Sequence, residues 1–321
     1  MRFPVKFLRF RRPAQRTVAV RWRPVSRIIS LSAVFILAGL LQACSAVKIA
    51  YNQAPDLAYW YFDGYVDFTG AQSLQIKEDL VKLQAWHRQT QLPGYIDTLA
   101  KLQRLMPSDI SSSQACEVFS EVQKKLVLVS IQAEPALAAL AASLGASQLR
   151  QLERKFATGN ADYRENFLDD TPKAMRSKRY KQAVNRAEML YGRLDEKQLQ
   201  RVGQSIDDSR FSAALSYTER LRRQQDALKT IRTLTANRAN QASGADTVPA
   251  SRAAIRALSD RMFHSPEAAY RNYIEQLTQD SCASFAGLHN STSPSQRKKA
   301  VDVLNAYEND LKTLAGSGRD G

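Results

Sequence analysis

The fold of this sequence is decided by four short stretches: Thr69-Gly70-Ala71-Gln72, Ser111-Ser112-Ser113-Gln114, Asp195-Glu196-Lys197-Gln198 and Ser293-Pro294-Ser295-Gln296. Each places a hydroxyl or carboxylate three residues before a glutamine. This is the spacing of a capping box, in which the first side chain accepts a hydrogen bond from a free backbone N–H and the glutamine accepts one from the cap residue. The four stretches therefore predict four helix starts.

Further helix starts are indicated by a proline directly after a hydroxyl residue, at Thr171-Pro172, Ser265-Pro266 and Ser293-Pro294. Proline fits the first helical position because its missing N–H would have no partner there. Between the starts, apolar residues recur at intervals of three and four, which is the helical period. We expect helices over 55–64, 70–90, 93–105, 112–142, 146–168, 172–192, 195–240 with a break near Asp207-Asp208, 252–262, 266–288 and 294–315.

No segment alternates strictly between polar and apolar residues, and no Asn-Gly or Asp-Gly hairpin turn occurs. These absences disfavour β-structure. The sequence predicts an all-α, elongated multi-helix bundle over residues 55–315, with a candidate subdivision at the Ser- and Gly-containing segment 241–251. We expect the tail 316–321 to be disordered.

The first 44 residues have the pattern of an export signal. Residues 1–27 carry nine basic side chains and no acid, and a 14-residue apolar run follows over 28–41. That run is shorter than the roughly 20 residues that span a bilayer. Leu41-Gln42-Ala43-Cys44 resembles a bacterial lipobox, which predicts a signal peptide over 1–43, a palmitate-bearing Cys44 and a tether over 44–54. The alternative is an uncleaved membrane anchor.

Removal of the signal peptide changes the charge argument. It takes away nine of the 46 basic residues and no acid, which leaves 37 against 31 and reduces the net charge from +15 to +6. The excess positive charge therefore marks the cytoplasmic side of the signal and not a nucleic-acid partner. Ser45, by analogy with lipoproteins, favours the periplasmic face of the outer membrane, with the inner membrane as the alternative.

Two cysteines remain in the mature chain, Cys116 and Cys282. In an oxidising compartment an even pair predicts a disulfide. The alternative is that both are small buried apolar residues.

Aromatic residues are concentrated directly after the predicted tether. Tyr59, Trp60, Tyr61, Phe62 and Tyr65 form a candidate surface for a partner or for the membrane interface. The favoured alternative is a packing stripe on the bundle, because helical spacing puts Leu57, Tyr61, Tyr65 and Phe68 on one face. The interleaved acids Asp56, Asp63 and Asp67 would be repelled by anionic headgroups.

A second candidate surface is basic. Lys173, Arg176, Lys178, Arg179 and Lys181 form a patch that suits an anionic polymer or lipid headgroups, although a solvated helix face is the more common explanation. A further basic stretch contains Arg220, Arg222, Arg223, Lys229 and Arg232.

No catalytic, metal-binding or cofactor-binding motif is present in the sequence. His87, His264 and His289 are far apart along the chain and are expected to be exposed or to cap helices. The acid pairs Asp169-Asp170 and Asp207-Asp208 fall at expected helix ends, where their charge compensates the helix dipole.

The segment from Tyr51-Asn-Gln-Ala-Pro55 through Tyr59-Trp-Tyr61 to Phe68 resembles a family of bacterial lipoproteins of unknown function. The lipobox, Tyr191-Gly-Arg-Leu194 and the stretch 289–297 extend the resemblance, which implies an address and a helical fold but no catalytic residue. A weaker similarity, carried by Phe68-Thr69-Gly-Ala-Gln72 and Leu194-Asp195-Glu-Lys-Gln198, is to periplasmic stress chaperones with Leu-Thr-x-x-Gln repeats.

Three functions follow as hypotheses. The first is a non-enzymatic lipoprotein that binds a protein or anionic polymer and is held at the membrane by its lipid. The second is a chaperone-like holder of unfolded envelope proteins, which would need an exposed apolar concavity. The third is an enzyme acting on the cell wall, which would need a pocket with converging polar groups.

The lipobox generates a direct test. Replacing Cys44 by Ala should block both lipid attachment and cleavage, because the thiol is the acceptor of the lipid. Metabolic labelling with a fatty-acid analogue should therefore mark the wild-type protein and leave an unlabelled, full-length Cys44→Ala precursor. Undiminished labelling of the variant would contradict the assignment.

Overall fold

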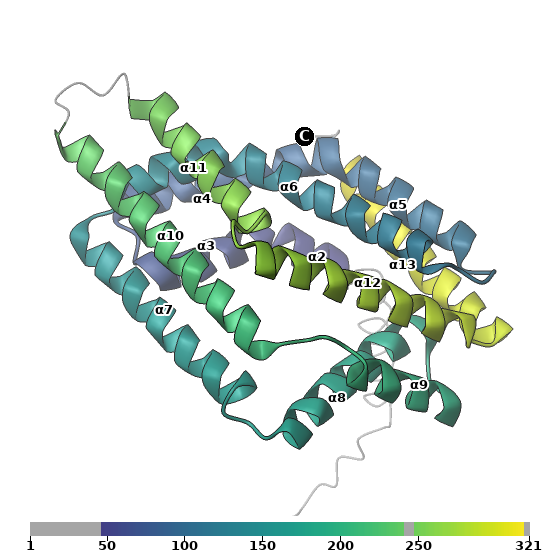
Figure 1. Ribbon diagram of the computed structural model, residues 1–321. Coiled ribbons are helices and arrows are strands. Elements are labelled where there is room, and N and C mark those ends of the chain that lie inside the picture. The colour runs from purple at the N-terminus through teal and green to yellow at the C-terminus, as the bar shows by residue number, and fades with distance from the viewer. Residues whose placement is uncertain (1–45, 241–246, 318–321) are drawn as a thin grey trace, which may run out of the picture. The chain divides into compact units, whose positions relative to one another are not determined.

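The computed structural model describes residues 46–240 and 247–317. Within these ranges every regular element is a helix, which confirms the all-α prediction (Figure 1). The predicted signal peptide 1–43, Cys44, residues 241–246 of the predicted linker and the end of the tail, 318–321, lie outside the described residues.

The helices follow one another with short connections. Their bounds are α2 (Ala46–Asn52), α3 (Ala54–Val66), α4 (Gly70–Trp86), a π-helical turn η1 (His87–Gln91), α5 (Leu92–Leu105), α6 (Ser112–Ser143), α7 (Ala146–Phe167), α8 (Pro172–Tyr191), α9 (Glu196–Asp207), α10 (Ala213–Asn240), α11 (Thr247–Phe263), α12 (Ala268–Asn290) and α13 (Pro294–Gly316).

The structure corrects three expected boundaries. The first helix was expected at residue 55, but residues 46–52 of the predicted tether already form α2, which packs on α13 with an ion pair between Lys48 and Asp310. The expected gap between 90 and 93 is bridged by η1. The helix expected at 252 starts at Thr247, inside the predicted linker.

All four predicted capping boxes are present. In α4, α6, α9 and α13 the cap side chain accepts from the glutamine N–H and the glutamine accepts from the cap N–H. A fifth helix, α7, begins with half of this arrangement. Gln148 accepts from the N–H of Gly145 at 2.9 Å, but glycine has no side chain to complete the box, so the sequence pattern did not reveal it.

The capping glutamines also bond to one another across helices. Gln148 Nε2 donates to Gln72 Oε1 at 2.7 Å, and Gln72 Nε2 donates to the carbonyl of Ser143 at 3.1 Å. Gln148 also donates to the carbonyl of Asp67 at 3.0 Å. The starts of α4 and α7 are therefore joined through two amide side chains.

The second pair joins α9 to α13 in the same way. Gln198 Nε2 donates to Gln296 Oε1 at 2.8 Å, and Gln296 Nε2 donates back to Gln198 Oε1 at 2.9 Å. Gln198 is 1% exposed, and its amide also reaches the carbonyl of Ser291 at 3.0 Å. Burial without such partners would cost free energy, so these hydrogen bonds offset the cost of burying the Gln198 amide.

At the five helix starts with a capping glutamine, the residue before the cap is also buried. Contact between this residue and the first turns fixes the direction in which the chain enters the helix. The five residues are Phe68, Ile110, Leu144, Leu194 and Thr292.

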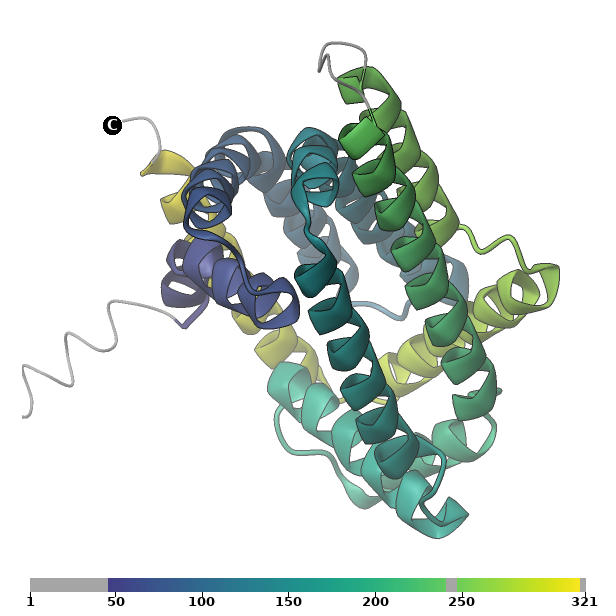
Figure 2. The ribbon, with the colours of Figure 1, turned by 90° about the vertical axis from the view of Figure 1, so that its left-hand side faces the viewer.

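The apolar core consists of three clusters. One joins α3, α4 and α7 through Val66, Ile76 and Leu152, and the second joins α6, α10 and α11. The third is formed between α5, α8, α9, α12 and α13 around Tyr191 and Leu304. Helix α7 contacts both α3 and α10, and Figure 2 shows it between them.

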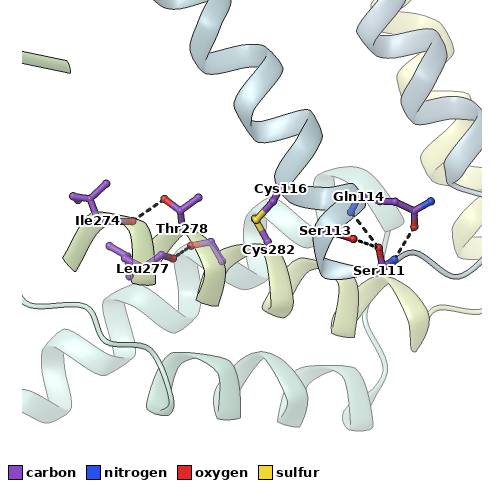
Figure 3. The surroundings of a disulfide bond; sticks show 9 residues. Ser111, Ser113, Gln114, Cys116, Ile274, Leu277, Thr278 and Cys282 are labelled. Carbon is purple, nitrogen blue, oxygen red and sulfur yellow. Dashed lines mark hydrogen bonds between the residues drawn. A yellow bond between two sulfur atoms is a disulfide. The ribbon is translucent and has the colours of Figure 1, made fainter. Parts of the chain in front are cut away.

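Cys116 and Cys282 form a disulfide with their Cα atoms 5.4 Å apart. The bond ties the start of α6 to α12. Figure 3 shows it beside the capping box of Ser111 and Gln114, so this helix start is fixed by both a cap and a covalent link.

His289 is completely buried, which corrects the expectation of an exposed or capping histidine. Its Nε2 donates to the carbonyl of Ser108 at 2.8 Å, and its Nδ1 accepts from the hydroxyl of Tyr191 at 3.0 Å. Burial lowers the pKa of His289, because the imidazolium form would lose its hydration.

The reciprocal amide pair generates a prediction about stability. Gln198→Ala should lower the free energy of unfolding by about 1–3 kcal/mol, because it removes the hydrogen bonds of the buried Gln198 amide to Gln296 and to the carbonyl of Ser291. In a double-mutant cycle, Gln198→Ala and Gln296→Ala should couple by about 0.5 kcal/mol or more. The exposed Gln204→Ala on the same helix is the matched control for urea unfolding. Strict additivity would show that the two amides do not support each other.

The buried histidine predicts a pH dependence. Its folded pKa lies below the unfolded value of about 6.5, so its full contribution to stability is present above that value and is lost as the pH falls towards the folded pKa. His87, whose pKa is also lowered by burial, acts in the same direction. The melting temperature should therefore fall between about pH 7.5 and about pH 5.5, where carboxylates stay ionised.

His289→Gln should be less stable overall and should show a shallower pH dependence over this range. His264→Gln, at an exposed position, is the control and should retain the wild-type slope. An unchanged slope in His289→Gln would mean that this histidine does not couple to unfolding.

Candidate ligand-binding cavity

A cavity of about 760 Å³ lies between α3, α6, α7, α10 and α11, with the start of α12 at its edge. Its size is within the range of about 300–1,000 Å³ typical of small-molecule sites. Most of its lining is apolar, with a few polar side chains from α7, α10 and α12. Representative lining residues are Tyr61, Phe62, Tyr65, Leu137, Leu144, Leu152, Phe156, Tyr163, Arg220, Arg223, Ala227, Ile231, Ile255, Met262 and Tyr270.

The lining is extended along α10. It runs from Ser216 to Ile231, which is about 22 Å of helix at 1.5 Å per residue. The part near Ile231 is formed by aliphatic side chains such as Leu144 and Ile255, whereas the part near Ser216 contains Arg220 and Arg223. The cavity is therefore long and has chemically different ends.

The polar end contains the buried Glu219, which is 3% exposed and binds several of the polar side chains there. The carboxylate accepts hydrogen bonds from Arg222 at 2.7 Å, from Arg223 at 2.8 Å and from the hydroxyl of Ser265 at 3.0 Å. Burial alone would raise the pKa of Glu219, but these three hydrogen bonds outweigh it and the pKa is lowered. Glu219 is therefore an anion that holds Arg223 at the cavity.

Arg220 is placed differently. Its Nε donates to the amide oxygen of Asn160 at 2.7 Å, and its guanidinium lies 5.8 Å from the ring centre of Tyr163. A side chain at Gly159 would come within 2.8 Å of the Arg220 guanidinium, so the glycine leaves room for it. Among the described residues, Arg220 forms no ion pair with a carboxylate.

The aromatic segment divides between core and surface. Phe68 and Val66 are buried, and Tyr65 packs partly against the same cluster. The packing stripe was wrong for Leu57 and Tyr61, which are 51% and 61% exposed. The inward face of α3 is set by its contacts with α4 and α7.

Several of the aromatic partner-surface candidates remain accessible. Trp60 is 66% exposed, and Tyr61 and Phe62 line the cavity from its α3 side. Tyr59 instead turns towards α4, where its hydroxyl donates to Ser73 at 3.1 Å. The aromatic segment thus contributes one wall of the cavity and an exposed surface beside it.

The predicted basic patch lies on α8 and is partly engaged within the protein. Arg176 forms a two-bond ion pair with Asp207, and Lys178 pairs with Asp170 at 2.8 Å. Arg179 lies over the ring of Phe211, 4.6 Å from its centre. The remaining two residues, Lys173 and Lys181, are exposed.

Helix α6 carries exposed apolar side chains. By length and composition alone it could cross a membrane. Within its most apolar stretch of 18 residues, 17% is buried. Phe119, Val122, Leu126 and Leu137 are each more than a third exposed and share one stripe at helical spacing. Phe119 lines a second cavity of about 510 Å³ and Leu137 lines the first, so the stripe contributes a residue to each.

Sequence reasoning included Arg220 and Arg223 only as members of a basic stretch, and it did not single out Tyr163 or Tyr270. Their grouping depends on tertiary contacts, in which Tyr163 of α7 meets Arg220 and Tyr270 of α12 meets Arg223. In the described ranges, no three His, Cys, Asp or Glu side chains are close enough together to hold a metal ion.

Fold and cavity together define an all-α, multi-helix protein with an extended apolar pocket. The chain belongs to DUF6279, a family of unknown function, whose model matches residues 64–246, more than half of the sequence. The match spans α4 to α10 and therefore includes Arg220 and Arg223. No curated protein and no solved structure matches the chain.

Proposed function

We propose that this protein is a non-enzymatic binding lipoprotein, anchored through Cys44 at the periplasmic face of the bacterial outer membrane, whose helical domain captures an apolar ligand. The observation that carries the binding role is the extended cavity between α3, α6, α7, α10 and α11. A space of this size with a mostly apolar wall stabilises a ligand by removing its apolar surface from water.

The proposed address is supported by two independent features. The signal-like segment and the lipobox-like Leu41-Gln42-Ala43-Cys44 precede the helical domain directly. The disulfide between Cys116 and Cys282 is typical of proteins from oxidising compartments such as the periplasm. The labelling of Cys44→Ala described above tests the anchor.

A second candidate function, the chaperone-like holder, is favoured by the exposed stripe on α6. Phe119, Val122 and Leu126 offer the apolar surface that such a protein needs. The two functions differ in the kind of molecule that is bound and in how many molecules bind to each protein. A holder suppresses aggregation of unfolded proteins, whereas a pocket protein saturates with one small apolar molecule.

The cavity generates a test of the binding role. The purified domain should enhance the fluorescence of the neutral apolar probe N-phenylnaphthylamine, because the pocket excludes water from the dye. Ala227→Phe should abolish most of this signal by filling the cavity from α10, where Ala227 lines the wall. Ala214→Phe, at an exposed position on the same helix, is the matched control and should bind the probe normally.

Ala227 is buried, so its enlargement carries a risk of overpacking. Leu137→Trp enters the same cavity from a position that is 38% exposed and provides a second variant. Full probe binding by two folded, cavity-filled variants would contradict the proposed site.

A further inference from the structure

We infer that the cavity binds a single-chain amphiphile with an anionic headgroup, such as a fatty acid or a lysophospholipid, with its headgroup at Arg220. The inference rests on the proposed binding function and adds the chemical class of the ligand. It is drawn from the separation of charge and apolar surface along the cavity.

The length of the cavity suits an acyl chain. From Arg220, where the headgroup is placed, to Ile231 the lining along α10 extends over about 16 Å, and one leaflet of a bilayer provides about 15 Å of hydrocarbon, half of the full core thickness. A chain taken from one leaflet therefore fits the aliphatic part with its headgroup at Arg220. Leu144, Leu152, Ile231 and Ile255 line that part and offer no polar group.

The charge at the other end suits an anion. Arg223 is already paired with Glu219, but Arg220 has no carboxylate partner among the described residues. The guanidinium of Arg220 lies over the ring of Tyr163, and that of Arg223 lies over the ring of Tyr270. Arginine held in this way presents N–H donors in a fixed direction, which favours a carboxylate or phosphate over a neutral group.

An extended peptide is a poorer occupant of the same space. Its backbone N–H and C=O groups would need partners along its whole length, and Leu144, Leu152, Ile231 and Ile255 supply none. An acyl chain has no such requirement. The observations therefore favour a lipid over a polypeptide.

The part of the chain that follows the proposed anchor contributes to the cavity wall. Tyr61 and Phe62 line its wall from α3, and α2 and α3 follow Cys44 almost directly in the sequence. A lipid on Cys44 would keep the domain at a membrane, where amphiphiles are available.

A charge series with one tail tests the inference. Palmitate, hexadecanol and hexadecyltrimethylammonium are titrated against the N-phenylnaphthylamine complex, each below its micellar concentration. Palmitate should displace the probe most tightly and the cation least. In Arg220→Gln the affinity for palmitate should fall about tenfold or more, which is the size of one charge-assisted hydrogen bond, while that for hexadecanol should stay the same.

Two further variants isolate the charge. Arg220→Lys should restore part of the preference for palmitate, because it keeps a cation at the same place. Lys229→Gln removes one positive charge from an exposed position of the same helix outside the cavity, and it should bind all three ligands like the wild type. Repeating the titration with lysophosphatidylglycerol distinguishes a phosphate from a carboxylate headgroup.

The outcomes separate the two levels of the proposal. Equal affinity for all three ligands, unchanged in Arg220→Gln, would overturn the headgroup assignment and leave the apolar binding function standing. Failure of the wild-type protein to bind the probe at all would overturn the binding function itself. Displacement by an apolar peptide but by no amphiphile would overturn the lipid class in favour of a polypeptide.

Discussion

The reciprocal bonding of capping glutamines is the constraint on which the rest of the structure depends. A helix start leaves backbone N–H groups without partners, and a capping box satisfies them locally. Here the same glutamines also bond across helices, so that Gln72 with Gln148 and Gln198 with Gln296 fix two helix starts against each other. Helix α7 begins at the Gln72–Gln148 pair and forms one wall of the cavity. The hydrogen bonds at its start therefore also position the site.

Much of the fold could be predicted from local chemistry, because capping is a local interaction. Thr69, Ser111, Asp195 and Ser293 all begin helices as their spacing to a glutamine indicated. The start of α7 escaped the pattern, because Gly145 carries no cap side chain. The cross-helix pairing escaped it as well, since nothing in either box specifies which other helix start lies beside it.

The candidate site was harder to predict, because it depends on which face of a helix finds a neighbour. Helix α3 carries apolar residues on several of its faces. The sequence predicted a packing stripe through Leu57 and Tyr61, but the structure leaves both residues exposed. The contacts with α4 and α7 instead select the face of Tyr65 and Val66. The role of Arg220 was equally hard to predict, because the sequence of a basic stretch does not show which of its arginines lacks an acidic partner in the fold.

The two glutamine pairs have a consequence for how the stability of the domain depends on salt and pH. An amide–amide bond has no net charge and no titratable proton, so neither dissolved salt nor acid acts on it directly. Ion pairs such as Arg176 with Asp207, which joins α8 to α9 at the surface, are screened by salt. In concentrated salt the surface ion pairs should therefore weaken first, while the glutamine pairs that hold the helix starts together stay formed.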